Sequence, residues 1–435
     1  MTVLPGDSGR GRHGALRFWL AVVGTGVVTG LGAIALTRLL EAVQRLAWGG
    51  NGTDILDTAR RVTAWRHVII LASAGVLTGL GQRILRRLSS GNGIDTTEAI
   101  WFYAGRMPVL RTLSSAVLSV VIVGMGASLG REGAPKQAGA VFANIFSDWL
   151  KLSDEERALL VACGSGAGMG AAYGVPLGGS LFALEVMRGR LALRLVLPAL
   201  LSSVIAALVS WLSLPDVPTY TIPSYSSSAS VLAFSLIAGP LAGLVSVAYV
   251  RAVTWADQTK PRGWQRFLAP TIILGLLGSI SIPFPELLGN GKDISQLAFV
   301  GQVGAPLLLA LVALKPLATI LCIRSGAPGG LFTPSLTVGA LFGGVLGAAW
   351  SWLWPGVPPG LFALIGAGAV LAGTTQGPIS TVVLMMELTG RDRSFIAPLL
   401  LAVGTATLVA RSIELRSVYD ARLTDEQVKA RHSHP

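Results

Sequence analysis

The longest stretch of this chain without a charged side chain is the feature that most limits its fold. Residues 325–386 contain no Asp, Glu, Lys or Arg. About 20 apolar residues are enough to cross a bilayer as a helix, so this stretch is long enough for several crossings or broken crossings. Shorter uncharged runs occupy residues 18–37, 112–130 and 158–184. Only 13% of all residues are charged, against about 25% in soluble proteins. The sequence therefore predicts an all-α membrane protein.

The net charge of +12 comes from short basic segments beside the apolar runs. These segments precede the first expected span, follow the second and follow the last: Arg10, Arg12 and Arg17; Arg83, Arg86 and Arg87; Arg411, Arg416, Arg422, Lys429 and Arg431. Such flanks mark the cytoplasmic side of a membrane. We therefore expect multiple spans with both termini in the cytoplasm. The expected partner is the lipid bilayer, and no nucleic acid is expected.

Residue types that carry enzyme chemistry show no useful spacing. Cys163 and Cys322 lie singly in apolar segments, and two cysteines define no disulfide framework. The four histidines lie at tails or span edges without metal-ligand spacing. The sequence contains no nucleophile elbow or phosphate-binding loop. It therefore predicts neither an enzyme nor a cofactor or metal site.

The two halves of the chain repeat one another. Three signals return in the same order at offsets of 198, 199 and 202 residues: Gly-Asn-Gly-Ile-Asp at 91–95 as Gly-Asn-Gly-Lys-Asp at 289–293, Pro135 as Pro334, and Pro176 as Pro378. Transporters often contain inverted-topology repeats with broken helices and a substrate site between them. We expect repeats at 18–214 and 231–412, a Pro- and Ser-rich linker at 215–230, and cytoplasmic tails at 1–17 and 413–435.

The first candidate anion segment is the glycine-rich run at residues 90–95. Glycines expose backbone N–H groups, and a helix that begins here directs its positive end toward them. Asn92 and Gly93 are the expected anion-binding residues, with Asn92 adding an amide donor. The alternative is an ordinary Asn-Gly turn in which Asp95 caps a helix.

The second candidate is the carboxylate of Glu132, which lies between Arg131 and Gly133 at the end of an uncharged run. A carboxylate within the membrane is costly and marks a functional site by default. Since it is itself an anion, it competes with a transported anion for the same site, and protonation removes that competition. The alternative is an ion pair between Glu132 and Arg131 at a membrane edge.

The third and fourth candidates lie in the second half. In the Gly- and Pro-rich segment 326–334, the N–H groups of Leu331 and Phe332 are expected to be free at a helix start. The alternative is a break that only joins two packed helices. The hydroxyl of Tyr419, just past the last span, is a candidate donor to an anion. Its alternative role is an interfacial aromatic anchor.

Together these segments resemble the ClC family of chloride channels and transporters, from about residue 18 to Tyr419. The family's Gly-Ser-Gly-Ile-Pro motif resembles residues 91–95, its Gly-Arg-Glu-Gly-Pro motif resembles 130–133, and its Gly-x-Phe-x-Pro motif resembles 330–334. The chain is most similar to the bacterial ClcB-type branch, which implies the inner membrane. The resemblance implies the ClC fold of two inverted-topology repeats with many tilted and broken helices.

The resemblance also implies a functional arrangement. It implies a homodimer with one path per subunit, with Glu132 as the gate between Arg131 and Gly133. It further implies a set of chloride-binding residues: Asn92, Gly93, Leu331, Phe332 and Tyr419. Asn92 stands where the family has serine, so the family's preference for chloride over nitrate does not carry over. Fluoride export by the same fold and a scaffold without transport are the alternatives.

Two further departures bear on mechanism. Proton-coupled members carry two adjacent glutamates near the cytoplasmic face, and here these positions are Glu185 and Val186. Because valine carries no proton, the pattern favours a chloride channel gated by a glutamate. The alternative is a chloride/proton antiporter in which Glu185 or a water chain replaces the missing glutamate. Lys136 follows the gate motif where an apolar residue is expected, and it either draws anions inward or is a snorkelling or ion-paired lysine.

Overall fold

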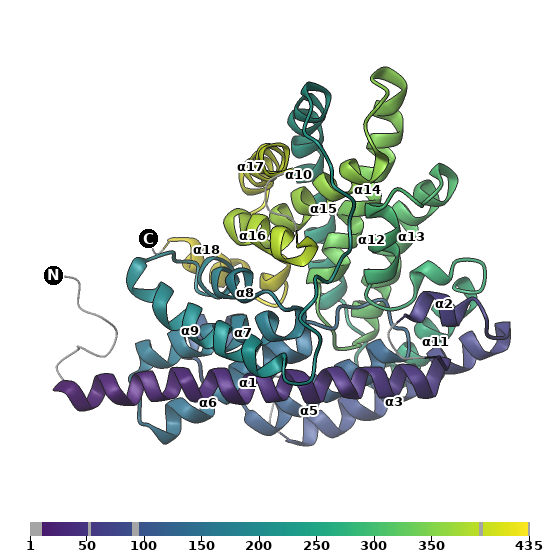
Figure 1. The fold of residues 1–435 in the computed structure, drawn as a ribbon. Coiled ribbons are helices and arrows are strands. Elements are labelled where there is room, and N and C mark those ends of the chain that lie inside the picture. The colour runs from purple at the N-terminus through teal and green to yellow at the C-terminus, as the bar shows by residue number, and fades with distance from the viewer. Residues whose placement is uncertain (1–10, 51–53, 89–94, 391–394, 434–435) are drawn as a thin grey trace.

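The computed structural model describes residues 11–50, 54–88, 95–390 and 395–433. Within these ranges the chain forms 18 α-helices, and the only β-type pairing is an isolated bridge between Gly130 and Gly330. The prediction of an all-α protein is therefore confirmed. Figure 1 shows most helices of the first half in the lower part of the molecule and most helices of the second half above them.

Seven of the described helices are long and apolar enough to cross a membrane. They are α1 (Gly11–Trp48), α3 (Ala64–Leu88), α9 (Leu193–Ser210), α10 (Ala229–Gln258), α13 (Ala305–Ser325), α14 (Phe332–Leu353) and α17 (Ile396–Ile413). The expected multi-pass membrane architecture is thus present. The first helix begins at Gly11, within the stretch expected to be a tail.

The remaining helices are shorter or less apolar. They are α2 (Ile55–Ala59), α4 (Thr96–Phe102), α5 (Val109–Gly124), α6 (Gly133–Trp149), α7 (Asp154–Tyr173), α8 (Pro176–Phe182), α11 (Gln265–Ile280), α12 (Lys292–Phe299), α15 (Pro359–Thr375), α16 (Pro378–Thr389) and α18 (Asp425–Ser433). A π-helix η1 (Ala183–Met187) and the 3₁₀ turns η2 (Pro285–Leu287) and η3 (Val418–Asp420) complete the described elements. Several are too short to span a bilayer alone, as broken helices require.

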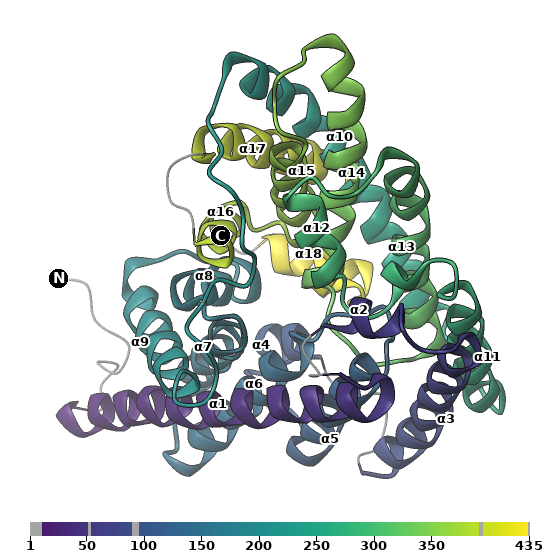
Figure 2. The same cartoon turned by 45° about the vertical axis from the view of Figure 1, so that its right-hand side comes forward.

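The two halves repeat the same helix packing. Helix α6 packs on α7 as α14 packs on α15, and α1 packs on α9 as α10 packs on α17. Helices α3 and α11, one from each half, pack against each other, and so do α8 and α16. Figure 2 shows these pairs from a second side.

Small residues allow the closest crossings, and they do so equivalently in both halves. A Cβ added at Gly139 in α6 would lie 2.0 Å from the carbonyl oxygen of Gly164 in α7. A Cβ added at Gly339 in α14 would lie 2.4 Å from the carbonyl oxygen of Gly366 in α15. Both distances are far below van der Waals contact, so these crossings require glycine. Close approach through small residues is the usual mode of helix packing in membranes.

Short sequence signals set the helix ends that matter for the site. Pro176 and Pro378 occupy the first positions of α8 and α16, where the missing N–H is harmless and the fixed φ fits a helix. Ser153 begins α7 with a capping box closed by Glu156. Helix α13 ends at Gly326, which has a φ of +91° that glycine adopts readily. The turn after Gly326 leads into the start of α14.

The segment between α9 and α10, which contains the expected linker, packs on the second half. Tyr220 is 2% exposed, and its N–H donates to the carbonyl of Leu388 at 2.8 Å. The hydroxyl of Tyr225 donates to the carbonyl of Phe299. The connection is therefore held in place by buried aromatic side chains.

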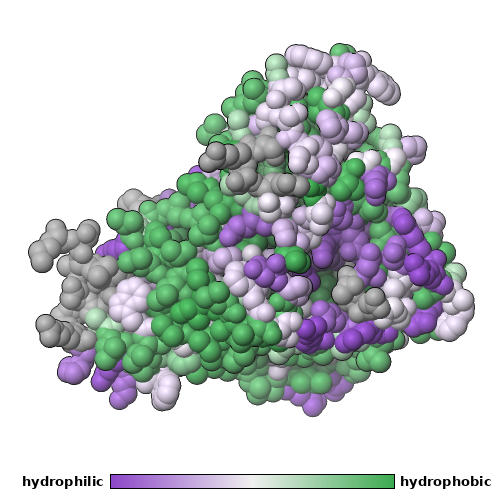
Figure 3. All heavy atoms as spheres, in the orientation of Figure 1, coloured by the Kyte–Doolittle hydropathy of each residue, from purple (hydrophilic) through white to green (hydrophobic). Residues whose placement is uncertain are grey.

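The outer surface carries many large apolar side chains. Leu193 is 87% exposed and Trp352 is 90% exposed. Figure 3 shows apolar residues gathered over α1 and α9, and hydrophilic residues on the side of α2. Exposed apolar belts of this kind are expected where helices face lipid.

Candidate functional site

The starts of α6 and α14 meet at the centre of the molecule. The N–H of Gly130 donates to the carbonyl of Gly330 at 2.8 Å, and the N–H of Gly330 donates back to Gly130 at 2.7 Å. These two glycines precede the two helices, one in each half of the chain. The backbone pair therefore brings Glu132, at the start of α6, against the start of α14.

The carboxylate of Glu132 is buried and hydrogen-bonded on both oxygens. Glu132 is 1% exposed, and its Oε1 accepts from the N–H groups of Phe332 at 2.7 Å and Thr333 at 3.4 Å. Its Oε2 accepts from the hydroxyls of Thr333 at 3.1 Å and Tyr173 at 3.2 Å. First-turn N–H groups have no partner within the helix, and they carry its positive end. The carboxylate thus occupies a ready-made anion site.

The glycine pair is required by the position of this carboxylate. A Cβ added at Gly130 would lie 1.9 Å from Oε1 of Glu132, and one added at Gly330 would lie 2.3 Å from it. A side chain at either position would therefore overlap the carboxylate. The two glycines leave room for Glu132 on α14.

Arg131 does not take the role of ion partner that the alternative interpretation gave it. Its guanidinium carbon lies 4.9 Å from the centroid of the Tyr173 ring, a cation–π distance. The carboxylate of Glu132 is directed to α14 instead. Arg131 therefore packs on Tyr173, whose hydroxyl holds Glu132.

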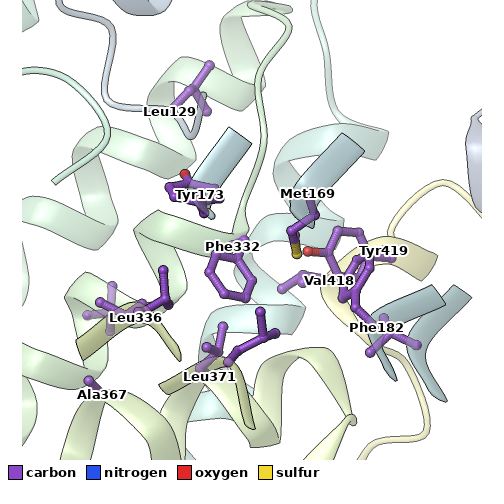
Figure 4. Close-up of a cluster of buried hydrophobic side chains, with 14 of the residues drawn as sticks. Leu129, Met169, Tyr173, Phe182, Phe332, Leu336, Ala367, Leu371, Val418 and Tyr419 are labelled. Carbon is purple, nitrogen blue, oxygen red and sulfur yellow. The ribbon is translucent and has the colours of Figure 1, made fainter. Parts of the chain in front are cut away.

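Tyr419 presents an unpaired hydroxyl to the interior. The residue is 7% exposed, and its hydroxyl has no hydrogen-bond partner among the described residues. Its ring packs edge-on against Phe182 with a centroid distance of 5.4 Å. Figure 4 shows the hydroxyl directed toward Met169, on the side of Phe332. Tyr419 is thus a free donor aimed into the protein rather than an aromatic anchor at the membrane surface.

The turn that carries Tyr419 is held by two arginines. Arg431 of α18 binds the carboxylate of Asp420 and the carbonyl of Val186. Arg416 donates to the carbonyl of Asp420 at 3.2 Å. Sequence reasoning treated both arginines only as topology signals, because nothing in their spacing indicates these partners. The structure assigns them to the support of Tyr419.

Glu185 and Glu387 form a reciprocal pair between the halves. Glu185 lies in η1 and accepts from two first-turn N–H groups of α16 at 3.1 and 2.6 Å. Glu387 lies in α16 and accepts from two first-turn N–H groups of α8 at 3.0 and 2.6 Å. The carboxylate of Glu185 is therefore engaged as a helix cap. Val186 beside it is 2% exposed and apolar.

Two cavities are lined by residues that are close to Glu132 in the sequence. The first has a volume of about 200 Å³ and is lined by Arg131, Tyr173 and Lys292, among others. We call it the Arg131 cavity. The second has a volume of about 440 Å³ and is lined by Gln137, so we call it the Gln137 cavity. Its lining contains six basic and two acidic side chains: Arg86, Arg111, Lys260, Arg262, Arg266 and Arg422; Glu98 and Asp257. The Gln137 cavity is therefore strongly attractive to anions.

The first predicted anion segment is only partly described. Asn92 and Gly93 lie outside the described residues. The described part begins at Asp95, whose carboxylate accepts from the N–H of Thr96 at 2.8 Å and caps α4. Helix α4 contacts η3, which carries Tyr419. Helix α4, which follows the first segment, therefore lies near Tyr419.

The second-half segment differs in one position from the expectation. The N–H groups that bind Glu132 belong to Phe332 and Thr333, while Leu331 is the cap residue before α14. Sequence reasoning did not single out Thr333 or Tyr173. Thr333 stands within the recognised motif, so its position was available as a signal. Tyr173 comes from the end of α7, and no local pattern indicates that it reaches Glu132.

Comparison with known proteins identifies the class of this protein. The family model described as "Voltage gated chloride channel" matches residues 70–411, which is well over half of the chain. The chain therefore belongs to the voltage-gated chloride channel (ClC) family, and it is a multi-pass membrane protein of that family.

Its curated relatives include proteins named as channels and a protein named as an exchanger. It is 31% identical to the putative chloride channel protein ClcB-like of Ralstonia nicotianae, over 91% of this chain and 94% of that protein. It is 31% identical to the H⁺/Cl⁻ exchange transporter ClcA of Citrobacter koseri, over 94% and 88%. It is also 31% identical to the chloride channel protein CLC-f of Arabidopsis thaliana over 88% of this chain, although it spans only 52% of that longer protein. The expected similarity to bacterial ClcB-like proteins is confirmed.

Solved structures show the same fold. A slow cyanobacterial Cl⁻/H⁺ antiporter matches with a TM-score of 0.81, covering 96% of this chain and 99% of that one at 21% identity. A CLC-type fluoride/proton antiporter matches with a TM-score of 0.75, covering 94% and 98% at 21% identity. The predicted ClC fold is therefore confirmed.

Proposed function

We propose that the protein passes chloride and similar small anions across the membrane as a channel gated by Glu132. The observation that carries this proposal is the carboxylate of Glu132 seated on the N–H groups of Phe332 and Thr333. A carboxylate and a chloride ion are both anions, so they compete for the same donors. While Glu132 is charged and seated, the site is closed to a transported anion.

Opening follows from the charge of the same carboxylate. Protonation weakens its attraction to the start of α14 and frees the donors for an anion. The Arg131 cavity is lined by the residue before Glu132 and by Tyr173, and the Gln137 cavity is lined by a residue five positions after Glu132. We expect an anion to reach the Glu132 site through these two cavities. Because the buried site excludes water, the charge of Glu132 has a large effect there.

The environment of Glu185 and Val186 supports transport without obligatory proton coupling. Glu185 is engaged as the cap of α16, and Val186 has no titratable group. The guanidinium of Arg431 binds the carbonyl of Val186, so a positive charge stands where a proton would need to pass. The names of the relatives include both a channel and an exchanger, and a chloride/proton antiporter using Glu185 or water is the alternative.

The cellular setting is part of the proposal. The protein lies in a bacterial inner membrane with both termini in the cytoplasm, because its basic segments flank the spans. It forms a homodimer with one path per subunit, which rests on the family resemblance. No cofactor takes part, and chloride is the transported ligand. Cross-linking in native membranes tests the dimer.

The decisive test is chloride efflux from liposomes that contain the purified protein. Wild-type efflux is expected to rise as the pH falls, because protons neutralise Glu132. Glu132→Gln removes the charge at every pH, so its efflux at neutral pH should exceed that of the wild type by about tenfold, a barrier change of about 1.4 kcal/mol, and lose its pH dependence. Glu41→Gln is the matched control, because Glu41 lines the Arg131 cavity without contacting α14. Absence of anion flux at every pH would contradict the proposal.

Proton coupling is measured in the same liposomes. A chloride gradient is imposed, valinomycin sets the voltage and a pH electrode follows the protons. The channel predicts chloride efflux without uphill proton movement. Protons driven uphill would establish the antiporter alternative.

A further inference from the structure

Helices α3 and α11 form a close antiparallel pair. A Cβ added at Gly75 would lie 2.4 Å from the Cα of Thr271, and one added at Gly79 would lie 3.3 Å from the Cα of Phe267. Four residues forward along α3 therefore correspond to four residues backward along α11. Figure 2 shows the two helices side by side. The end of α3 and the start of α11 consequently lie at the same end of the pair.

Basic side chains gather at this common end. Arg86 comes from the last turn of α3, Arg266 from the first turn of α11, and Arg262 from the connection before α11. All three line the Gln137 cavity, and we call them the arginine cluster. The charges of Arg266 and of Arg83, one turn earlier in α3, act on Arg86. Like charges gathered in this way repel one another, so the cluster favours an anionic partner.

The two carboxylates of the cavity do not neutralise the arginine cluster. Asp257 pairs with Lys260 and with Arg422, whose Nε lies 3.6 Å from its carboxylate. Neither Asp257 nor Glu98 comes within 4.0 Å of a guanidinium nitrogen of the cluster. In the part of the chain that the structure describes, the three arginines form no ion pair at all. Their positive charge is therefore available to a ligand.

Most hydrogen-bond donors of the arginine cluster are also available. The Nε of Arg266 donates to the carbonyl of Pro261 at 3.0 Å. Arg86 and Arg262 donate no hydrogen bond to any described residue. A guanidinium has five N–H donors in a planar fork, and this fork matches two oxygens of one phosphate group. Several such forks in one cavity indicate a phosphate group as the ligand.

Exposed apolar side chains continue from the arginine cluster along the same two helices. Each helix carries a row of three at a spacing of four residues, which places them on one stripe. All six are between 40% and 65% exposed, and each row extends about 12 Å along its helix. The rows are Val76, Leu80 and Ile84 in α3, and Leu268, Ile272 and Leu276 in α11. A charged end followed by an apolar stripe is the order of groups in a phospholipid.

We propose that the arginine cluster binds the phosphate group of an anionic phospholipid, whose acyl chains lie on the apolar rows of α3 and α11. Basic pockets between membrane helices are typical sites for anionic headgroups. The cavity volume of about 440 Å³ leaves room for a phosphate group together with waters of about 30 Å³ each. A soluble phosphate compound fits the arginines but makes no use of the apolar rows. The inference concerns a lipid ligand, so it goes beyond the proposed function.

Native mass spectrometry of the delipidated protein in detergent tests this site. The probes are phosphatidylglycerol, which is anionic, and phosphatidylcholine with the same acyl chains. The wild type should bind phosphatidylglycerol about tenfold more tightly, because the arginines attract its net charge. Arg266→Gln and Arg262→Gln should each weaken phosphatidylglycerol binding about fivefold, since each removes one charge near the headgroup. Neither substitution should change the binding of phosphatidylcholine.

Arg17→Gln is the matched control, because Arg17 is an exposed arginine of α1 that does not line the cavity. It should leave the affinity for both lipids unchanged. Arg262 is exposed in a connection, so Arg262→Gln keeps the test decisive if Arg266→Gln does not fold. Equal affinity of the wild type for the two lipids would overturn the inference. Unchanged phosphatidylglycerol affinity in the arginine variants would overturn it as well.

Two further measurements distinguish a lipid from a soluble phosphate compound. Inorganic phosphate at the same concentration should not displace phosphatidylglycerol, and displacement would show that the ligand is a soluble phosphate instead. Ile272→Ser keeps every arginine and should weaken phosphatidylglycerol binding severalfold, whereas Leu31→Ser, at an exposed position of α1, should not. Unchanged affinity in Ile272→Ser would overturn the placement of the acyl chains. Because none of these measurements involves transport, absence of anion flux would refute the proposed function alone.

Discussion

The two halves of the chain meet at two pairs of helix starts, and the two pairs are built differently. At α8 and α16 the arrangement is reciprocal: Glu387 caps α8 and Glu185 caps α16. At α6 and α14 it is one-sided, because Glu132 from the first half is seated on the start of α14. The position 199 residues after Glu132 is Leu331, so no carboxylate returns the contact.

Under the proposed function, the reciprocal contacts of Glu185 and Glu387 are structural, and we call them the joint, whereas the one-sided contact of Glu132 is the gate. In the reciprocal pair, each half contributes one carboxylate and receives one, and both carboxylates bind only backbone N–H groups in the described contacts. In the one-sided pair, a single carboxylate closes a site that has its own donors from Thr333 and Tyr173. Under the proposed function, loss of charge on Glu132 frees these donors for an anion.

The reciprocal pair gives the largest expected effect. Glu387→Ala leaves two first-turn N–H groups of α8 without acceptors, and Glu185→Ala does the same to α16. A hydrogen bond to a charged group contributes about 1.5–3 kcal/mol, so each variant should lose roughly 2–4 kcal/mol of stability, and the two losses should be similar. Steric-trapping measurements of unfolding in bicelles determine these losses.

Glu426→Ala provides the control for this pair, because Glu426 is an exposed carboxylate of α18. It should leave stability unchanged. If only one of the two capping variants lowered stability, the two caps would not contribute equally to stability. The contrast between this reciprocal pair and the one-sided contact of Glu132 would then not hold.

The one-sided pair gives an intermediate effect through Gly130. An added Cβ would lie 1.9 Å from Oε1 of Glu132, so Gly130→Ala should expel the carboxylate from α14. Chloride efflux at neutral pH should then rise about fivefold to tenfold, a barrier change of about 1–1.4 kcal/mol, and its pH dependence should weaken. Efflux from liposomes at pH 5 and pH 7 measures both quantities.

Gly404→Ala is the matched substitution, since a Cβ at this position in α17 meets nothing within 4 Å. It should leave efflux unchanged. If Gly130→Ala kept the efflux and the pH dependence of the wild type, the observed contact of Glu132 with α14 would not control efflux. The proposed functional difference between the Glu132 contact and the Glu185–Glu387 contacts would then be wrong.

The sequence predicted the repeated helices that carry both pairs of helix starts, but it did not predict the contacts between them. The uncharged run at 325–386 and the offset of about 200 residues indicated a helical membrane protein with two repeats. The motifs around Glu132 and Phe332 indicated that a carboxylate and a helix start belong to one function. These are local signals, carried by composition or by a few adjacent residues.

The contacts that complete the site depend on residues far apart in the chain. Tyr173 reaches Glu132 across 41 positions, and Arg431 reaches Val186 across 245. Neither residue carries a local pattern that specifies its partner, because helix tilt and packing decide what its side chain meets. For the same reason, the sequence left Glu185 as a candidate for proton transfer, whereas the structure places its carboxylate on α16.

The smallest expected effect concerns Arg431, which links the two regions. Its guanidinium binds Asp420, next to Tyr419, and the carbonyl of Val186, next to Glu185. Arg431→Met should loosen the turn that aims Tyr419 and weaken chloride binding by less than about threefold. The effect is small because Ser417 also binds the carboxylate of Asp420 at 2.7 Å.

Lys429→Met serves as the control for this change, because Lys429 is an exposed lysine of the same helix. Calorimetric chloride titrations of both variants measure the difference. Equal affinities would mean that the packing of Tyr419 on Phe182 and Lys136 is sufficient to orient the hydroxyl. A loss of stability as large as that of Glu185→Ala would instead mean that Arg431 stabilises the contact between the two halves. A small loss of chloride affinity with unchanged stability would show that Arg431 affects the anion site without contributing to that contact.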